Sequence, residues 1–433
     1  ILTLVFKKNT DTKKIFFLMF GIVFIVFLFT SDGHRYTIDE FHPQQMAFRM
    51  ITLEPDPAYI QGESKMQFNY PIMNPWNIGP LCSNAFTCYP TSIFYSITEI
   101  PFIAINYYFH IIDSDTLVLS IDDFQAPHYV LWRNSENVDL VFMELFYGAF
   151  FSAFSVTIFF LICLEHKFSR NNSLILSFLL AFSTMIWAYS NTSLNVVPVL
   201  FFVLLGYLFY KKFQRSTKSK FLLLSSSFLG FAFLIRSDVI LFIIPIWFAL
   251  LISILKRNSK VYSLLFYSIP LLFSYFGNRF VNSLRYISST LSDGDIPSVK
   301  SNISSFGKFL FVSPSEIFTG LFGLLFAPGV GLFIFSPILL TIFFSFPDFY
   351  RKNKSDCLLL LSFFAMNLFY HAYFYFWHGL VAWGPRYLLL TIPFLLIPLG
   401  ASLEKRNKKF MFLLIIILGA MGVLFNMVYV VQD

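Results

Sequence analysis

The chain has few charged residues: Asp, Glu, Lys and Arg together make up 13% of its 433 residues, whereas hydrophobic residues make up 57%. An ordinary soluble domain carries about 25% charged residues. The shortage therefore excludes a soluble domain. The apolar runs recur along the chain and are long enough to cross a bilayer, so the sequence predicts an integral, polytopic membrane protein.

Cysteine is also scarce, with four residues in the whole chain. No cysteine–histidine spacing resembles a zinc site, so no cofactor is assigned and the need for a divalent metal stays open. Cys82 and Cys88 lie close together in a long loop. If that loop is extracytoplasmic, they are a disulfide candidate.

The net charge of +7 does not indicate nucleic-acid binding, because of where the basic residues lie. Most of them form short clusters between the hydrophobic runs, as the positive-inside rule predicts for cytoplasmic loops. An internal repeat of the kind found in transporters built from two related halves is not apparent. The basic clusters are therefore interpreted as topology signals.

The N-terminal part predicts a retained first helix and a large outer loop. The run 15–30 lacks a small-residue cleavage site, which favours a membrane span with a cytoplasmic N-terminus over a signal peptide. The segment 31–140 is rich in acids and poor in lysine, so we expect it outside. Within it, Pro43 is expected to start a helix that continues through residues 44–53. The apolar stretch 90–112 is expected to form interfacial or re-entrant helices on the bilayer.

The remaining runs complete a single all-α transmembrane domain over residues 1–433, with about eleven spans by hydropathy. After the first span and the loop, residues 141–430 hold the other spans. We expect these at 141–164, 174–190, 193–210, 221–236, 239–256, 262–281, 328–347, 357–377, 386–403 and 411–430.

Four groups of unusual residues fall on the predicted outer side. They are Asp39-Glu40 with His42, the Arg236-Ser237-Asp238 joint, the Pro/Gly-punctuated run 325–337, and Trp377-His378-Gly379 followed by residues 382–387. Each has an ordinary explanation. A polar turn can cap a span, an arginine can reach to lipid headgroups, and Trp or Tyr can form an interfacial belt. These explanations leave open why all four groups lie on one side.

The order of these elements resembles the GT-C class of polytopic glycosyltransferases, which use polyprenyl-phosphate sugars. Protein mannosyltransferases and lipid A aminoarabinose transferases belong to it. That class has an acidic dyad in the outer loop just after the first span, as Asp39-Glu40 does here, although Phe41-His42-Pro43 replaces a small residue and a tyrosine. Arg236 is similar to an arginine that follows an apolar span in these proteins. The runs 327–337 and 383–387 resemble segments of uncharacterised members.

Chemistry and resemblance together suggest roles for these residues. Transfer of a sugar from a lipid phosphate needs a base for the acceptor's proton and positive charge for the departing phosphate. We expect Asp39 as catalytic base with Glu40 second, and Arg236 and Arg386 on the phosphate. The other substrate-binding candidates are His42, Trp383, Tyr387 and His378. The expected partners are a polyprenyl-phosphate-linked sugar donor, an unknown acceptor and the lipid bilayer, with no nucleic acid.

Two other functions stay open from the sequence. A lipid or solute transporter would need ionisable residues within the spans, for which Glu144 is the best candidate. A catalytically silent subunit of a membrane complex would need none of this chemistry. The transferase hypothesis requires Asp39, Arg236 and Arg386 to line one outward-facing cavity.

Overall fold

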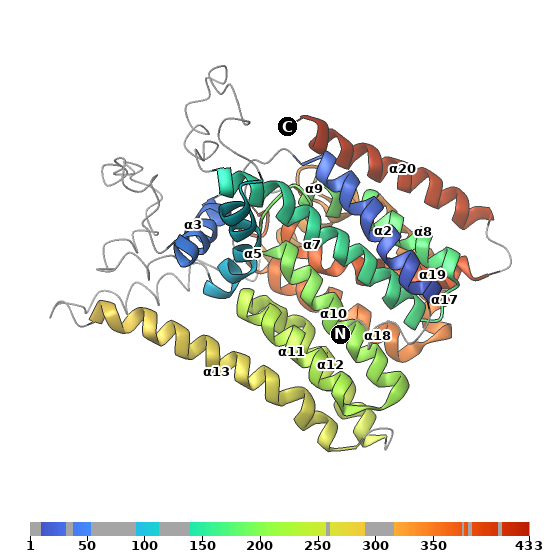
Figure 1. The fold of residues 1–433 in the computed structure, drawn as a ribbon. Coiled ribbons are helices and arrows are strands. Elements are labelled where there is room, and N and C mark those ends of the chain that lie inside the picture. The colour runs from blue at the N-terminus through green and yellow to red at the C-terminus, as the bar shows by residue number, and fades with distance from the viewer. Residues whose placement is uncertain are drawn as a thin grey trace.

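The computed structural model describes residues 10–31, 38–52, 92–111, 138–256, 260–290, 316–374, 376–379, 383–405 and 409–432. Its regular elements in these ranges are α-helices and short 3-10 helices, which confirms the predicted all-α architecture. Most of the helices run roughly parallel or antiparallel to one another in a bundle (Figure 1).

The described residues form sixteen α-helices. They are α2 (Thr10–Phe29), α3 (Ile38–Thr52), α5 (Ile93–Phe109), α7 (Val138–Glu165), α8 (Arg170–Phe182), α9 (Ile186–Tyr189), α10 (Val196–Ser216), α11 (Ser219–Ile235), α12 (Ile240–Leu255), α13 (Tyr262–Thr290), α15 (Ile317–Phe326), α16 (Leu332–Phe335), α17 (Ile342–Lys352), α18 (Lys354–Ala372), α19 (Ile392–Leu403) and α20 (Lys409–Gln432). Three 3-10 turns, η4 (Ser237–Val239), η6 (Pro337–Thr341) and η7 (Arg386–Thr391), lead into α12, α17 and α19.

Seven helical segments in the described ranges are long and apolar enough to cross a membrane, so the expected count of about eleven is not confirmed. Two expected spans are broken by local structure. The run 174–190 divides between α8 and α9 at residues 183–185, and the run 328–347 divides at Ser336-Pro337, where the backbone leaves the α-helical form. A third, 221–236, corresponds to α11, which is apolar but only 17 residues long.

The bundle has buried and peripheral helices. The apolar windows of α10 and of the η7–α19 segment are 89% buried, whereas those of α2 and α20 are 22% buried. The outward faces of α2, α13 and α20 carry exposed phenylalanine, leucine and isoleucine side chains. Such a large apolar surface is unfavourable in water and suits contact with lipid.

Helices α3 and α5 form the described part of the predicted outer loop. Contrary to expectation, α3 begins at Ile38, so Pro43 lies inside the helix. Because proline has no N–H, the carbonyl of Asp39 loses its usual helical donor, and the rest of the helix continues around this gap. Helix α5 confirms the expected helix in the stretch 90–112. The hydroxyl of Ser92 caps its first turn by accepting from the Phe94 N–H at 3.2 Å.

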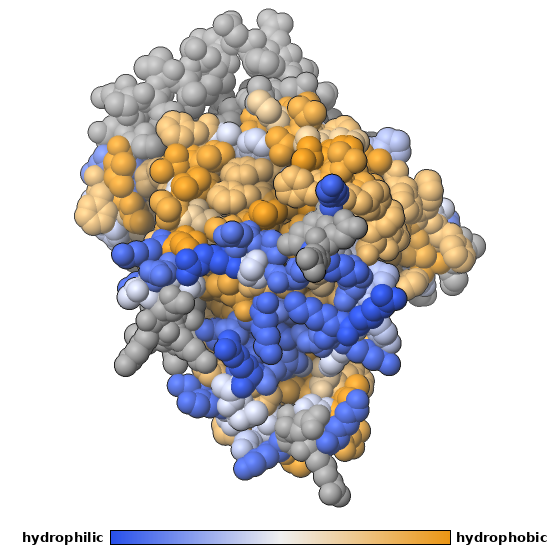
Figure 2. All heavy atoms as spheres, turned by 90° about the vertical axis from the view of Figure 1, so that its right-hand side faces the viewer, coloured by the Kyte–Doolittle hydropathy of each residue, from blue (hydrophilic) through white to orange (hydrophobic). Residues whose placement is uncertain are grey.

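The basic residues gather at one end of the bundle, which we call the basic end. It comprises the joints α7–α8, α10–α11, α12–α13, α17–α18 and α19–α20, with exposed cations such as Lys167, Arg215, Arg351 and Lys405. Figure 2 shows hydrophilic side chains concentrated on the side of the molecule that faces the viewer there, with hydrophobic atoms on its flanks. Helices α3, α5 and α9 lie toward the opposite end of the bundle, which we call the site end (Figure 1).

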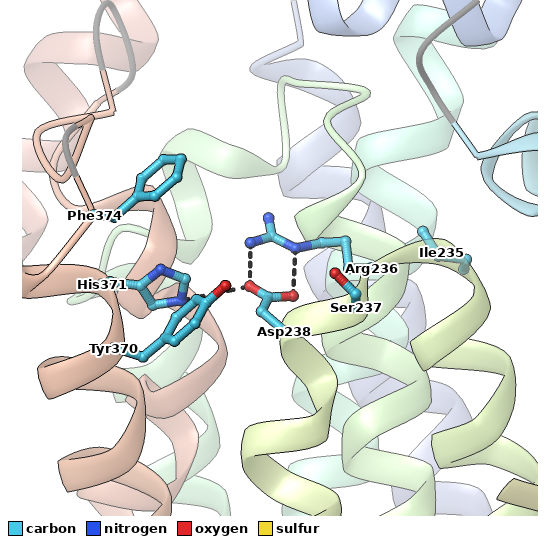
Figure 3. Close-up of a pocket in the computed structure, with 7 residues that line it drawn as sticks. All are labelled: Ile235, Arg236, Ser237, Asp238, Tyr370, His371 and Phe374. Atoms are coloured by element: carbon cyan, nitrogen blue, oxygen red, sulfur yellow. Dashed lines mark hydrogen bonds and ion pairs between the residues drawn. The ribbon is translucent and has the colours of Figure 1, made fainter. Parts of the chain in front are cut away.

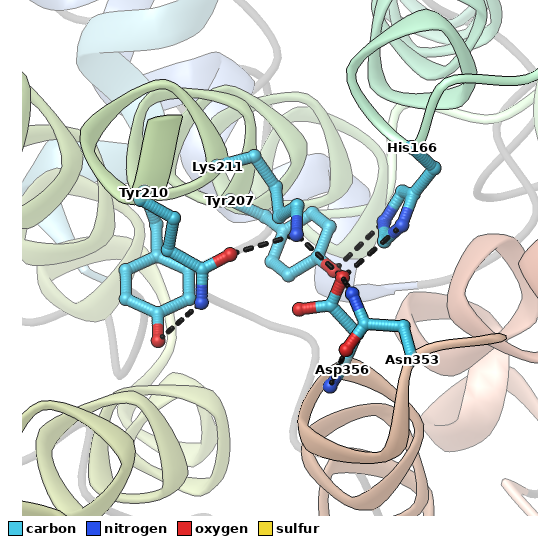
Figure 4. Close-up of polar contacts among 7 residues, drawn as sticks. His166, Tyr207, Tyr210, Lys211, Asn353 and Asp356 are labelled. Atoms are coloured by element: carbon cyan, nitrogen blue, oxygen red, sulfur yellow. Dashed lines mark hydrogen bonds and ion pairs between the residues drawn. The ribbon is translucent and has the colours of Figure 1, made fainter. Parts of the chain in front are cut away.

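A buried polar cluster joins three helices at the basic end (Figure 4). The carboxylate of Asp356 in α18 accepts from the Lys211 ammonium of α10 at 2.5 Å and from the Asn353 amide at 2.6 Å. His166, just after α7, places Nδ1 3.4 Å from the same oxygen, and its Nε2 lies 3.1 Å from the Tyr207 hydroxyl. Because Lys211 and Asp356 are both buried, each charge depends on the other.

Asp356→Ala should strongly destabilise the protein, because it leaves the buried Lys211 ammonium without its carboxylate. Breaking a buried ion pair in this way costs about 3–5 kcal/mol. The control is Lys405→Met, because the Lys405 side chain is 54% exposed and pairs with Asp348 at the surface. Such a pair contributes about 0–1 kcal/mol. Thermal unfolding in detergent measures both. An equal loss of thermal stability in Asp356→Ala and Lys405→Met would show that the Asp356 cluster does not hold these helices together.

Candidate active site

The joint between α11 and α12 presents a paired arginine and aspartate. Arg236 has extended backbone (φ −139°, ψ 122°) and Asp238 lies in the following 3-10 turn, so the two side chains point to the same side of the joint. The Arg236 Nε donates to Asp238 Oδ1 at 3.0 Å and its Nη2 donates to Asp238 Oδ2. This forked pair is the strongest geometry available to an arginine and a carboxylate, and it fixes the guanidinium plane.

A cavity of about 250 Å³ opens beside this pair, and Figure 3 shows side chains of the α11–α12 joint facing those at the end of α18. His371 places Nε2 3.5 Å from Asp238 Oδ2, and its side chain is buried. The residues that line the cavity are Ile235, Arg236, Ser237, Asp238, Tyr370, His371 and Phe374. A space of this kind, with an ion pair on one wall and aromatic rings on the other, suits a ligand that has a polar part and an apolar part.

The second predicted arginine lies next to this cavity. Gly384 has a φ of +64°, which glycine adopts without strain, and after Pro385 the η7 turn begins at Arg386. The guanidinium of Arg386 lies 5.1 Å from the centroid of the Tyr387 ring, and its Nη2 donates to the Tyr387 hydroxyl at 3.2 Å. Tyr387 stacks on His371 with centroids 4.9 Å apart. Contrary to the expectation, Arg386 is not among the residues that line this cavity; it is linked through Tyr387 to His371 on the cavity wall.

Two other candidates from the same stretch do not line this cavity. The Trp383 ring packs against Phe335 at 4.9 Å and against Tyr429 at 4.7 Å between centroids. His378 contacts the ring of Trp377 at 5.5 Å. A substrate-binding role for either residue stays a prediction.

The acidic helix α3 is held by a buried segment, Ser190–Asn195, which we call the connector. Glu40 in α3 is fully buried, and its Oε1 accepts from the Ser193 N–H at 3.0 Å. One turn later, Gln44 Nε2 donates to the Ser193 hydroxyl at 2.9 Å and to the Glu144 carboxylate of α7. The Tyr95 hydroxyl of α5 donates to the Ser193 carbonyl. The connector thus fixes α3 and α5 against α7.

The connector also reaches the arginines. Asn195 Oδ1 accepts from Arg236 Nη1 at 3.2 Å. Arg386 is joined to Arg236 through a chain of contacts: Arg386 donates to the Tyr387 hydroxyl, Tyr387 stacks on His371, and His371 Nε2 lies 3.5 Å from the Asp238 carboxylate that holds Arg236. The structure therefore brings Glu40, Arg236 and Arg386 around one place, although they are far apart in the chain.

Several predicted residues cannot be placed. Asp39 lies next to Glu40 on the backbone of α3, but its side chain and that of His42 are outside the described part of the molecule. Cys82 and Cys88 also lie outside the described residues. Where side chains are described, no group of three or more His, Cys, Asp or Glu is arranged to hold a metal ion.

Comparison with known proteins bears on the family and the fold. Residues 144–275 match the family model of dolichyl-phosphate-mannose-protein mannosyltransferases. The structure is similar to ArnT from Cupriavidus metallidurans in the apo state, with a TM-score of 0.54 and 9% identity over 94% of this chain. It is also similar to the same protein bound to undecaprenyl phosphate, with a TM-score of 0.52 and 11% identity over 94% of this chain. A search of curated proteins gave no match.

The chain has the GT-C fold. It spans 63% of the length of the ArnT chains, so it corresponds to part of that larger architecture. The segment that matches the mannosyltransferase model runs from Glu144 in α7 to Tyr275 in α13 and includes the connector, Arg236 and Asp238. The matched segment thus carries the connector and the Arg236–Asp238 pair, whereas Arg386 and His371 lie outside it.

Within this GT-C fold, Gly148→Ala should disturb the connector. A Cβ at Gly148 in α7 would meet the carbonyl oxygens of Ser190 and Thr192, so backbone has to shift to make room. Overpacking of this kind costs about 1–3 kcal/mol. Gly21→Ala in α2 is the matched control, because a Cβ there meets nothing within 4 Å and alanine favours a helix. Thermal unfolding of the two variants measures the difference; a loss at Gly21 as large as that at Gly148 would contradict the close approach.

Proposed function

We propose that this protein is a membrane glycosyltransferase that moves a sugar from a polyprenyl-phosphate donor to an acceptor on the extracytoplasmic side. The observation that carries the proposal is the meeting of Arg236 and Arg386 with the acidic helix α3 around the connector. The GT-C fold and the ArnT relative bound to undecaprenyl phosphate support a lipid-linked phosphate as the donor group.

The proposed reaction uses one carboxylate and the two guanidinium groups. Asp39 takes the proton from the acceptor group, whose freed lone pair attacks carbon 1 of the sugar. The bond between that carbon and the phosphate oxygen breaks, and polyprenyl phosphate leaves with an additional negative charge. Arg236 and Arg386 stabilise that charge through charge-assisted hydrogen bonds.

Glu40 has a different place in this proposal. Its carboxylate already accepts from the Ser193 N–H in a fully buried position, so it holds α3 in register rather than facing the acceptor. The neighbouring Asp39 then supplies the base. This ordering agrees with the expectation that Asp39 is the first candidate and Glu40 the second.

The proposed sidedness rests on charge. Basic residues between spans favour the cytoplasm, and in this bundle the exposed cations gather at the basic end. Arg236 lies at the joint between α11 and α12, and Arg386 lies at the start of η7 before α19. Both positions are at the site end, opposite the basic end. The site would therefore face the extracytoplasmic side, at the depth where a polyprenyl tail can remain in the bilayer.

The transporter alternative depends on Glu144, the ionisable residue that the sequence offered within a span. Glu144 lies in the second turn of α7, at the site end, and its carboxylate accepts from Gln44. It lies at the site-end start of the apolar segment Val141–Glu165 and contributes to the packing of α3, so its position does not favour a transport step in the middle of a span. Mass spectrometry of surface glycans in cells with and without the protein tests the proposed function. Identical glycans would contradict it.

Asp39→Asn should abolish transfer while the protein inserts and folds normally, because an amide cannot accept the acceptor's proton. Glu40→Gln should be milder, since the amide oxygen of glutamine can still accept from the Ser193 N–H. The measurement is sugar transfer by membranes that contain equal amounts of each variant. Near wild-type transfer by Asp39→Asn would remove it from the mechanism, and the opposite ranking would exchange the two roles.

Arg386→Lys should insert normally but bind the polyprenyl-phosphate donor more weakly, because lysine keeps the charge and loses the planar fork. We expect a loss of roughly 1.5–3 kcal/mol, the net value of a hydrogen bond to a charged group. Arg351→Lys, at an exposed position of the basic end, is the matched control and should leave donor binding unchanged. Unchanged affinity in Arg386→Lys would leave Arg386 as a headgroup anchor and assign the phosphate to Arg236 alone.

A further inference from the structure

A buried nitrogen on the wall of the cavity makes no hydrogen bond. The side chain of His371, at the end of α18, lines the cavity and is 4% exposed. Its Nε2 lies 3.5 Å from Asp238 Oδ2, which is longer than the distance of about 2.7–3.2 Å in an N–H···O hydrogen bond. Among the residues that the structure describes, this nitrogen has no hydrogen-bond partner. A buried polar atom in this state is unfavourable, so His371 offers the cavity a hydrogen bond that the fold does not use.

The charged groups beside this nitrogen favour an uncharged ligand atom. The charge of the Asp238 carboxylate is balanced by the Arg236 fork. An anion against His371 Nε2 would lie next to that carboxylate and be repelled, and a cation there would compete with Arg236. A hydroxyl group can accept from the Nε2–H and donate to Asp238 at the same time. The separation of 3.5 Å leaves room for a hydroxyl oxygen at about 2.8 Å from both atoms.

The remaining walls and the size of the cavity suit a single small ring. Tyr370 and Phe374 face the cavity from the end of α18, and Ile235 lines it from the end of α11 (Figure 3). The volume is about 250 Å³, whereas pockets for drug-sized ligands hold about 300–1,000 Å³. The space therefore excludes a polyprenyl chain. A sugar ring combines hydroxyl groups at its rim with apolar C–H faces, which matches the polar and aromatic walls.

The two arginines relate this cavity to the phosphate of the donor. Arg236 lines the cavity, whereas Arg386 lies beside it and contacts Tyr387. A phosphate bound by both guanidinium groups therefore belongs at the edge of the cavity, not within it. In a polyprenyl-phosphate sugar, the phosphate joins the lipid chain to the sugar. With the chain in the bilayer and the phosphate at the edge, the group next to the phosphate is the sugar.

We propose that the cavity binds the sugar of the donor, a neutral hexose, with one of its hydroxyl groups between His371 and Asp238. This inference rests on the proposed function and adds the sugar subsite to it. His371 Nε2 donates to the hydroxyl oxygen, and the hydroxyl donates to the Asp238 carboxylate. The rings of Tyr370 and Phe374 contact the C–H faces of the sugar. These residues distinguish the sugar-bearing lipid from the lipid phosphate alone.

The test compares wild type, His371→Phe and Phe374→Ala in nanodiscs. The probes are undecaprenyl phosphate and its mannosyl, glucosyl and galactosyl derivatives. His371→Phe keeps a ring against Tyr387 and loses Nε2. We expect it to bind at least one hexosyl lipid roughly 3- to 10-fold more weakly, as for the loss of one hydrogen bond, and undecaprenyl phosphate as tightly as wild type. Phe374→Ala, at a partly buried position, should show the same selective loss.

His166→Phe is the matched control. His166 is also buried, but it lies at the basic end with its Nε2 3.1 Å from the Tyr207 hydroxyl. This variant should lower the melting temperature and leave the affinity for every probe unchanged. His371→Phe should keep the melting temperature of wild type, because its Nε2 has no hydrogen-bond partner to lose within the described residues.

The other results would overturn the inference. If His371→Phe weakens all the probes equally, His371 acts on the phosphate or on the fold and does not bind the sugar. An unchanged affinity for every hexosyl lipid in both cavity variants would also place the sugar elsewhere. So would a wild type that binds undecaprenyl phosphate and none of the hexosyl lipids. In these three cases the phosphate-binding part of the proposed function stands. If wild type binds none of the probes, the proposed function fails as well.

Discussion

The site depends on the three hydrogen bonds of one residue, Ser193. Its N–H holds Glu40, its hydroxyl accepts from Gln44 and its carbonyl accepts from Tyr95. These partners belong to α3 and α5, which have no long apolar span to anchor them independently. In a buried setting each unmade bond would cost about 1–3 kcal/mol. The acidic helix is therefore positioned by backbone and side-chain polar groups together, and Asn195 extends the same segment to Arg236.

Two guanidinium groups lie near each other on the arginine side. Arg236 is forked to Asp238, and the nearby Arg386 repels it. Placing two cations side by side near a membrane is unfavourable unless an anion joins them. The stacked rings of His371 and Tyr387, with centroids 4.9 Å apart, connect the two arginines without a direct contact between the guanidinium groups.

The sequence predicted the fold class and singled out Arg236, Arg386 and Tyr387, but it did not single out His371 or the connector, which join them. Long apolar runs predict α7, α10 and α20, because length and hydropathy are enough to identify a membrane span. The break in 174–190 could not be predicted, since the Met185 N–H is satisfied by Ser336, 151 residues later. Arg236 and Arg386 stood out as charges at span ends. His371 did not, because one His in an apolar run is indistinguishable from a packing residue.

Polar clusters at both ends of the bundle fix the positions of neighbouring helices along their axes. Helix α18 carries Asp356 at its start, paired with Lys211, and His371 at its end, 3.5 Å from Asp238. Helix α10 runs between Asn195 and Lys211, roughly 24 Å apart at 1.5 Å per residue. Apolar contacts between helices in lipid tolerate sliding, because no hydrophobic driving force opposes it there. A shift of one residue would break the bonds at the basic end. The same bonds therefore hold the cavity wall in place at the site end.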